Sequence, residues 1–547
     1  MPFSDARAQL VQWARQTAAP TIMFDGGSAS DPDGNYYYSI TGAQQYLFDY
    51  NTDDGHLVNA VANDFLLVKY DNTGARQWIR SIRNGLVGKI FFRANEQQLC
   101  VTGSFADSVV FAPGVKLNAA HGFFLARYTS DGTLLNAQLL ARDAPAYTLG
   151  VDVTMDDTGN ILLTGTLYGS AFIGEPSAGD TLITTPPGGY ALLAKLDNLG
   201  KFEWVQSWKF GDEIWPGRTA SDDAGNIYVS GYFQGFGYLG NTYFWGFDTS
   251  DDLFLIKFSP TGSLLWSKHL ATSGEDFLGE LVVKPGGDVY LSNVFGDSVV
   301  TFNRGRPDQS TVAVANPYPS NQIDYLLRFN SDGTLIGAVP FDLQGGSLVA
   351  RPGGGLAMAV ACDNCTLFPD AATPVSLAGD WPRVSYFLVT MDDNLEYQGH
   401  SGWLFSGYNG DFTPLPPSPL PDGDFYVATM FRYNLWFPSG PFTSLGNDQE
   451  LMIIKTTGTP ALPAHEAPAG YVFRILPNPV GDRFVVETNA AGDAVSVVIT
   501  DVRGQVVFNK NPVSGRTQID SKNWKPGVYN VSIVTPTGIY SQRCIKH

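Results

Sequence analysis

The chain has 547 residues, of which 44% are hydrophobic and 16% charged, as expected of a globular protein with a large core. Its 34 basic residues are outnumbered by 53 acidic ones, which gives a net charge of −19. Nucleic acid and anionic membrane surfaces are therefore disfavoured as partners, because both require concentrated lysine and arginine. No stretch reaches the roughly 20 apolar residues of a membrane-spanning helix. Residues 1–20 lack a basic segment followed by an apolar one, so we expect no secretory signal there.

The first predicted element is residues 9–16, around Trp13. Trp13 lies 21 residues before Gly34, as Trp204 lies 21 residues before Gly225, by subtraction of the residue numbers. This equal spacing predicts a strand that belongs to the last repeat described below. The apolar residues of the segment also fit one face of a short helix, so both interpretations stay open. The residues on that face are Ala6, Leu10, Trp13 and Ala14, with Ser4 at the N-cap.

A module of strands and turns recurs along the chain up to residue 457. Its most visible part is an apolar run that ends near a turn, and corresponding positions in successive runs lie 58 to 71 residues apart. A period of this length leaves room for four strands and predicts the blades of a β-propeller. The seven runs are Phe65–Tyr70, Phe123–Tyr128, Ala191–Leu196, Leu253–Phe258, Tyr325–Phe329, Tyr386–Met391 and Leu451–Lys455.

Several repeats add a strand with a Trp four residues after the turn glycine, as from Gly200 to Trp204. The seventh repeat has none, because Gly458 is followed by Pro460. We therefore expect the N-terminal strand to supply the missing piece and to cover the strand edge that the ring would otherwise expose.

Polar residues at equivalent places in the first strand of a repeat are candidates for the wall of the central channel. Counting from the Trp position gives Arg218 and Glu280, and Val151 next to Asp152. These side chains would contact a ligand in the channel or simply form a wet wall. A pair of carboxylates there would also suit glycoside cleavage, but only if their spatial separation were right.

Residues 232–248 are rich in aromatic side chains, which bind sugars or proteins when exposed. Phe233 and Tyr238 have counterparts in other repeats and are expected in the core. Tyr243, Phe244 and Trp245 have none, so we take them as candidate ligand-binding residues.

The sequence contains few motifs that would indicate catalysis or metal binding. No metalloprotease, nucleophile-elbow or phosphate-loop motif occurs, and the chain is not expected to be an enzyme. Two Asp/Asn clusters faintly resemble calcium loops, but they lack the glycine and glutamate positions of an EF-hand, so turns are favoured and no cofactor is expected. The two clusters are Asp31, Asp33 and Asn35, and Asp156, Asp157 and Asn160.

The cysteines are few. Cys362 and Cys365 suggest a local disulfide or two free thiols, and Cys100 lies in a predicted core strand.

Beyond a Pro-rich linker at 458–470, short alternating strands predict a small β-sandwich. The predicted strands are Arg483–Thr488, Ala494–Asp501, Gln505–Asn509, Gly527–Val534 and Ile539–Ile545.

Three motifs of this module resemble the type A C-terminal sorting domains of the Bacteroidota type IX secretion system. They are Leu476-Pro477-Asn478-Pro479, the segment from Ile499 through Asp501 and Gly504, and the terminal part with Gly527, Tyr529, Gly538 and Lys546. The resemblance implies an immunoglobulin-like sandwich, engagement with the type IX secretion machinery, and a secreted or cell-surface location. The repeats likewise resemble the β-propellers of bacterial secreted proteins, best at residues 221–231 and 252–266.

We therefore predict an all-β protein with a seven-bladed β-propeller over residues 1–457, closed by an N-terminal strand, and a sorting domain over residues 471–547. The predicted function is a binding, adhesion or surface-assembly module whose partner is an extracellular protein, a glycan or another copy of the chain. The alternatives are an extracellular polysaccharide hydrolase or lyase, and a structural subunit of an extracellular filament or layer. Propellers serve unrelated functions, so the fold does not choose among them.

Overall fold

The computed structural model describes residues 11–456 and 473–546, apart from short internal segments. Those segments are 20–26, 42–44, 50, 53–54, 61–63, 143–151, 187, 211–212, 247–249, 275, 297–298, 314–322, 342–345, 363, 368–374, 379–384, 407–416, 432–433, 438–439, 444–449, 478–479, 489–495, 502–505, 511–514, 526 and 536–537. Every element of the described residues is a strand, as the all-β prediction requires. Among these residues there is no helix long and apolar enough to span a membrane.

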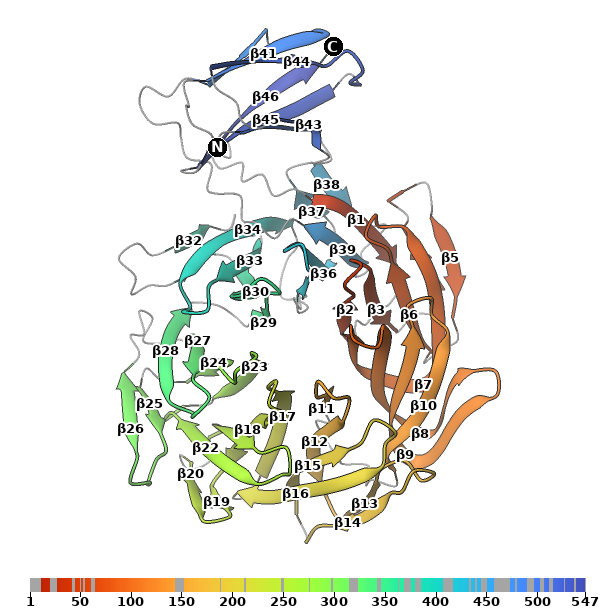
Figure 1. Cartoon of the computed structure of the whole chain (residues 1–547), viewed down its shortest axis with the longest axis vertical. Helices are drawn as coiled ribbons and strands as arrows, with labels where there is room; N and C mark the ends of the chain where they lie inside the picture. Colours follow the sequence, from red (N-terminus) through yellow and green to blue (C-terminus); the bar gives the residue numbers. More distant parts are fainter. Residues whose placement is uncertain are drawn as a thin grey trace.

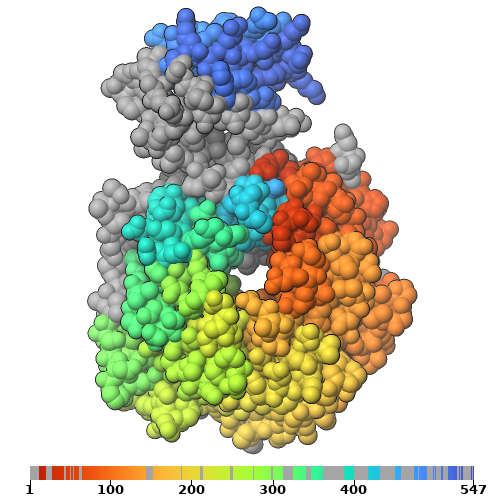
Figure 2. Space-filling view, in the orientation of Figure 1, coloured from red at the N-terminus to blue at the C-terminus, as the bar shows by residue number. Residues whose placement is uncertain are grey.

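Six sheets formed by the strands between Val11 and Thr456 surround a central opening, which gives a propeller-like ring (Figure 1). Figure 2 shows the opening between the packed atoms of the ring. Five of these sheets have six strands each and follow one strand order. Four strands come from one repeat, and a hairpin from the following repeat is added at the outer edge.

The first two of these sheets are the best examples of the order. One contains β11 (Asp152–Met155), β12 (Ile161–Leu167), β15 (Tyr190–Leu196), β16 (Phe202–Phe210), β19 (Phe236–Leu239) and β20 (Thr242–Trp245). The next contains β17 (Glu213–Ser221), β18 (Ile227–Gln234), β21 (Asp252–Phe258), β22 (Leu264–Ala271), β25 (Val299–Phe302) and β26 (Ser310–Ala313).

The remaining six-stranded sheets repeat the order around the ring. One contains β23 (Phe277–Val283), β24 (Val289–Phe295), β27 (Ile323–Phe329), β28 (Leu335–Phe341), β31 (Asn364–Leu367) and β32 (Val375–Ala378). Another contains β29 (Gly346–Ala350), β30 (Leu356–Cys362), β33 (Ser385–Met391), β34 (Tyr397–Ser406), β37 (Asn434–Phe437) and β38 (Gly440–Thr443). The last contains β35 (Ser418–Pro419), β36 (Phe425–Phe431), β39 (Glu450–Thr456), β1 (Val11–Ala18), β4 (Gln45–Phe48) and β5 (His56–Asn59).

The sixth sheet of the ring has nine strands because β7 belongs to two repeats. The first half of β7 pairs with β6 up to Arg83, and the second half pairs with β8 from Gly85 onward. Asn84, between them, has a positive φ of 59°, which turns the strand without ending it. The members are β2 (Ser28–Ser30), β3 (Tyr36–Ile40), β6 (Asp64–Tyr70), β7 (Arg76–Arg93), β8 (Gln98–Ala112), β9 (Val115–Thr129), β10 (Leu134–Arg142), β13 (Ser170–Ile173) and β14 (Thr181–Thr184).

The N-terminal segment is a strand, so the helical alternative is wrong and the strand prediction is confirmed. β1 pairs antiparallel with β39, with Trp13 opposite Lys455 and Gln16 opposite Met452. On its other side, Thr17 pairs with Phe48 of β4. The two ends of the ring-forming chain therefore meet in one sheet.

Each of the seven apolar runs lies in a strand, as predicted: β6, β9, β15, β21, β27, β33 and β39. Every residue of β6, β21 and β39 is buried, because each strand is covered on both faces by neighbouring sheets. The sequence of such a strand is a continuous apolar run rather than an alternation of apolar and polar residues. The core consequently consists of layers between adjacent sheets, as where Leu162 and Leu193 of one sheet pack with Ile227 and Phe254 of the next.

A Trp in the fourth strand of a repeat joins it to the turn of the next repeat. The indole N–H of Trp266 donates to the carbonyl of Ser331 at 3.0 Å, and Lys257 donates to the same carbonyl at 3.1 Å. The indole covers Gly333, where a Cβ would come within 2.9 Å of the ring. Trp13, Trp78 and Trp204 donate to the carbonyls of Asn72, Ser130 and Pro260 in the same way.

The repeat with Asn136 in the Trp position joins its neighbour through different side chains. Arg127 donates to the carbonyl of Asn198 at 2.8 Å and to Gln138 at 2.8 Å. Gln138 lies against Gly200, as the indole does elsewhere. The contact between repeats is thus retained although the Trp is not.

The C-terminal module has two sheets that share one core. The first sheet contains β40 (Phe473–Leu476), β41 (Arg483–Thr488) and β44 (Gly515–Asp520), and the second contains β43 (Val506–Lys510), β42 (Ser496–Asp501), β45 (Gly527–Thr535) and β46 (Gly538–Lys546). Phe484 and Ile519 of the first sheet pack with Ile499, Val531 and Cys544 of the second. All five predicted strands are present, and the alternation of inward apolar residues that predicted them is explained by this two-sheet core.

Candidate ligand-binding surfaces

The polar residues predicted for the channel wall lie on the first strands of adjacent repeats. Asp152 is on β11, Arg218 on β17 and Glu280 on β23, and these strands contact one another in that order around the opening. Arg218 forms a bidentate ion pair with Glu280, with N···O distances of 3.0 and 3.1 Å. Burial opposes the charge of Arg218, but the Glu280 carboxylate outweighs burial and raises the pKa of Arg218.

Lys89, on β7, is a wall residue that the sequence did not predict. Its ammonium group lies 2.9 Å from Asp152, whose other carboxylate oxygen accepts the backbone N–H of Thr219 at 2.9 Å. Cations and carboxylates thus alternate over four repeats and neutralise each other in pairs. Both carboxylates on this part of the wall are held by a cation, so the arrangement links neighbouring strands.

The aromatic hairpin β19–β20 lies on the outside of the ring (Figure 1), and one of its faces is exposed. Its side chains form two cross-strand pairs, Phe236 opposite Trp245 and Tyr238 opposite Tyr243. Phe236, Tyr238 and Trp245 are 64%, 63% and 46% exposed, and Tyr243 is half-buried. Ring centroids are 4.9 Å apart from Tyr238 to Tyr243 and 6.3 Å apart from Tyr243 to Trp245. We refer to these four residues as the aromatic face.

The prediction for this hairpin needs two corrections. Phe244 is fully buried against Phe233 and His269, because it alternates with Tyr243 and Trp245 along the strand and points to the core. Tyr238 is exposed rather than buried, whereas Phe233 lies in the core as expected. A hairpin with Gly240 and Asn241 as its two-residue turn places every second residue of each strand on one face, a signal that identifies Phe236 and Tyr238 as partners of Trp245 and Tyr243.

Two arginines from the next repeat hold the hairpin in place. Arg306 donates to the carbonyl of Tyr243 at 2.6 Å, and its guanidinium lies 4.4 Å from the ring centroid of Phe244. Arg304 donates to the carbonyl of Gly246 at 2.7 Å and stacks on Trp245 at 5.0 Å. The guanidiniums thus contact the hairpin on both its backbone and its rings, which fixes the aromatic face before any ligand arrives.

The Asp/Asn clusters are turns, as the sequence favoured. One carboxylate oxygen of Asp31 accepts the N–H groups of Asp33 and Asn35, and the other accepts the hydroxyl of Tyr37 at 2.7 Å. Asp156 accepts the N–H groups of Thr158 and Asn160 in the same manner. Over the described part of the chain, no three ligating side chains gather as a metal ion would require.

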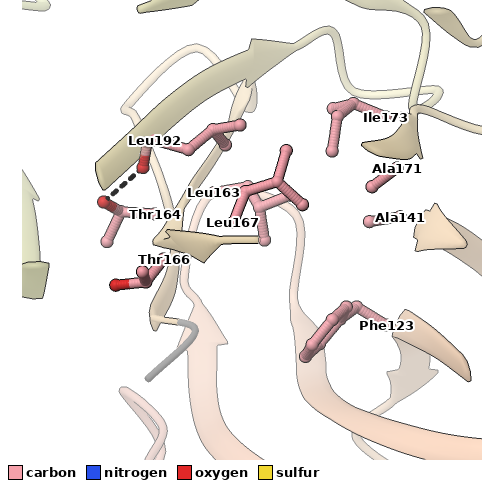
Figure 3. A pocket seen from close by; sticks show the side chains of 10 residues that line it. Phe123, Ala141, Leu163, Thr164, Thr166, Leu167, Ala171, Ile173 and Leu192 are labelled. Atoms are coloured by element: carbon pink, nitrogen blue, oxygen red, sulfur yellow. Dashed lines mark hydrogen bonds between the residues drawn. The ribbon is translucent and has the colours of Figure 1, made fainter. Parts of the chain in front are cut away.

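A small apolar cavity of about 30 Å³ lies between two adjacent sheets of the ring (Figure 3). It is large enough for about one water molecule, but no polar atom lines it, so water gains nothing there. A cavity of this size has no room for a ligand larger than water. The lining residues are Phe123, Ala141, Leu163, Thr164, Gly165, Thr166, Leu167, Ala171, Ile173 and Leu192.

The cysteines that the structure describes are buried thiols. Cys100 and Cys544 are free and fully buried, and burial raises the pKa of each to about 11. Cys100 lies in the core, as predicted. The side chains of Cys362 and Cys365 lie outside the part that the structure describes.

In the C-terminal module, the predicted sorting residues gather at strand ends. Lys546, near the end of β46, is buried and forms an ion pair with Asp482 at 3.0 Å. Tyr529 is buried, and its hydroxyl donates to the carbonyl of Lys525 at 2.7 Å. Pro477 follows β40, Asp501 ends β42, and Gly527 and Gly538 begin β45 and β46. Asn478, Pro479 and Gly504 lie outside the described residues.

A comparison with protein families matches residues 474–547 to the secretion system C-terminal sorting domain. This module is a type IX sorting domain. Its presence indicates that the protein is secreted or displayed on the outer cell surface, and that it engages the type IX secretion machinery. No curated protein matches the chain.

Solved structures that are similar to the chain include three proteins of low sequence identity. PorZ, a surface component of the type IX secretion system of Porphyromonas gingivalis, is 13% identical, with a TM-score of 0.24 over 97% of this chain and 75% of that one. The Dos1 propeller is 9% identical, with a TM-score of 0.37 over 80% and 95%. The WD40 domain of SCAP from fission yeast is 8% identical, with a TM-score of 0.31 over 80% and 98%. Likeness at this level says nothing about what this protein binds.

Proposed function

We propose that the sorting domain exports a seven-bladed β-propeller that serves outside the cell as a binding or surface-assembly module. The strand order supports seven blades, because each six-stranded sheet supplies one set of four and the nine-stranded sheet divides at β7 into two more. The two sheets with a common core support an immunoglobulin-like sandwich in the sorting domain. The domain limits in this proposal are 1–457 for the propeller, 458–470 for the linker and 471–547 for the sorting domain.

The aromatic face is the observation that carries the proposal. Among the side chains that the structure describes, the other exposed large apolar residues on outer hairpins are single aliphatic ones, such as Leu57 on β5 and Leu182 on β14. Scattered single residues are normal on a protein surface, whereas a contiguous exposed cluster marks a contact site. The clamp formed by Arg304 and Arg306 supports this assignment, since it orders the rings in advance.

The test is to present the labelled full-length chain to an array of glycans and peptides while soluble products and oligomeric state are monitored. We expect retention of one ligand class without turnover. Steady release of shortened glycans would instead support the polysaccharide-cleaving alternative. Concentration-dependent growth of oligomers with no bound ligand would support the filament or layer subunit.

A further inference from the structure

We propose that the aromatic face of β19–β20 binds a short stretch of a neutral glycan chain, an inference that rests on the binding function proposed above. Each ring offers an apolar surface to the C–H faces of a sugar, and the hydroxyl and indole groups at the ring edges offer polar contacts. The centroid spacings of 4.9 and 6.3 Å arrange the rings in a continuous strip. Successive sugar rings of one chain fit such a strip.

The size of the face argues against a protein partner. Two strands of four residues give an apolar face of about 130 Å², from a length of about 13 Å and a width of about 10 Å for two strands. A stable protein–protein interface buries about 800 Å² on each partner. The described surface around the hairpin adds no further cluster of large exposed apolar side chains, since Leu239 and Phe244 are buried. A ligand of two or three sugar units matches the area that is available.

Charge argues for a neutral rather than an acidic glycan. The chain has a net charge of −19, so a polyanion would be repelled on approach. Arg304 and Arg306 are already engaged with the hairpin backbone, at Gly246 and Tyr243. Lys209, which pairs opposite Tyr238 on β16, lies over the ring of Tyr190 at 5.9 Å. A neutral chain avoids the repulsion and uses the stacking surface alone.

The experiment measures binding of the full-length protein to neutral and acidic polysaccharides by affinity electrophoresis, with the variants Trp245→Ala and Tyr238→Ala. We expect retardation by a neutral polysaccharide, weakened about tenfold or more in either variant. Leu182→Ala is the matched control, because Leu182 is 54% exposed on the equivalent hairpin β13–β14. It should bind like the native protein, and all variants should keep the native melting temperature within a few degrees.

Each other outcome overturns a defined part of the argument. Glycan binding that survives both aromatic substitutions, or that is stronger for acidic polymers, overturns the assignment of a neutral glycan to this face. Binding of a peptide, or of a second copy of the chain, through the same residues also overturns the assignment of a neutral glycan. In that case the proposed binding function still holds. If the protein retains no glycan, peptide or second copy at all, the proposed function fails with it.

Discussion

His269 is a buried histidine whose surroundings oppose its positive charge. The side chain is fully buried among Phe233 and Phe244, and neither ring nitrogen has a hydrogen-bond partner. Burial, and then the nearby charges of Arg306 and Arg304, lower the pKa of His269 to about 3. Between about pH 3 and about pH 6.5 the imidazole is thus neutral in the folded protein, whereas an exposed histidine is charged.

We predict that His269 makes the protein lose stability as the pH falls from about 6.5 to about 3. In this range the unfolded chain binds a proton that the folded chain does not, which lowers the free energy of unfolding by up to about 1.4 kcal/mol per pH unit. The variant His269→Phe should remove this part of the acid sensitivity. Urea unfolding at pH 7.5 and pH 4.5 measures the loss of stability in the native protein and in the variant. An equal loss in both would contradict the assignment to His269.

The turn glycines that face a Trp should tolerate substitution less well than other turn glycines. Gly333 has a φ of 76°, and an added Cβ would meet the ring of Trp266 at 2.9 Å. Gly286 has a similar φ of 87° but no atom within 4 Å of that position. Gly286→Ala should therefore cost about 1 kcal/mol from backbone strain alone, and Gly333→Ala about 1–3 kcal/mol more from displacing the indole. Equal midpoints of thermal unfolding for the two variants would contradict the packing role of the glycine.

At the scale of elements, the strand β1 decides whether the ring holds together. It covers the edge of β39 along seven residues, from Glu450 to Thr456, and brings Trp13 onto the turn at Asn72 and Gly74. Without β1, both the edge of β39 and the core beside Tyr426 and Tyr70 are uncovered. Exposed strand edges pair with other chains.

We predict that removal of residues 1–18 lowers the melting temperature strongly and causes association through β39. The substitution Trp13→Ala should have a smaller effect in the same direction, about 2 kcal/mol for a half-buried Trp. Gln12→Ala, on the same strand, removes only an exposed hydrogen bond to Asp424; it is the control and should change little. Differential scanning calorimetry with light scattering checks all three. A truncated protein that melts like the native one, without association, would show that β1 contributes no stability.

The sequence predicted the repeated elements well because their causes are local. The third strand of each repeat is buried on both faces, so a run such as Leu253–Phe258 is visible without knowledge of its neighbours. Lys89 was missed because β7 continues past Asn84 with no turn to mark a new repeat. The addition of each hairpin to the preceding sheet was also missed, since a partner in hydrogen bonding leaves no trace in a single sequence.

For the whole molecule, the sorting domain and the ring have separate cores, because the described apolar clusters do not mix their residues. We predict that deletion of residues 473–547 leaves the ring folded but abolishes export. Fractionation of cells that express the truncated chain, with circular dichroism of the purified product, checks both parts. Normal export of the truncated chain would contradict the assignment.

Lys546→Ala, which leaves Asp482 without its ion pair, should destabilise the sorting domain while the ring melts as before.

The hairpin that every repeat lends to its predecessor constrains how this architecture can change in length. Excision of one repeat would remove the hairpin that the sheet before it receives, and the hairpin of the repeat after it would then have to cover that sheet. A viable insertion or loss must therefore contain four strands and one lent hairpin together, so that every sheet still receives a hairpin. Gene duplications that respect this frame are the ones expected to yield rings of a different size.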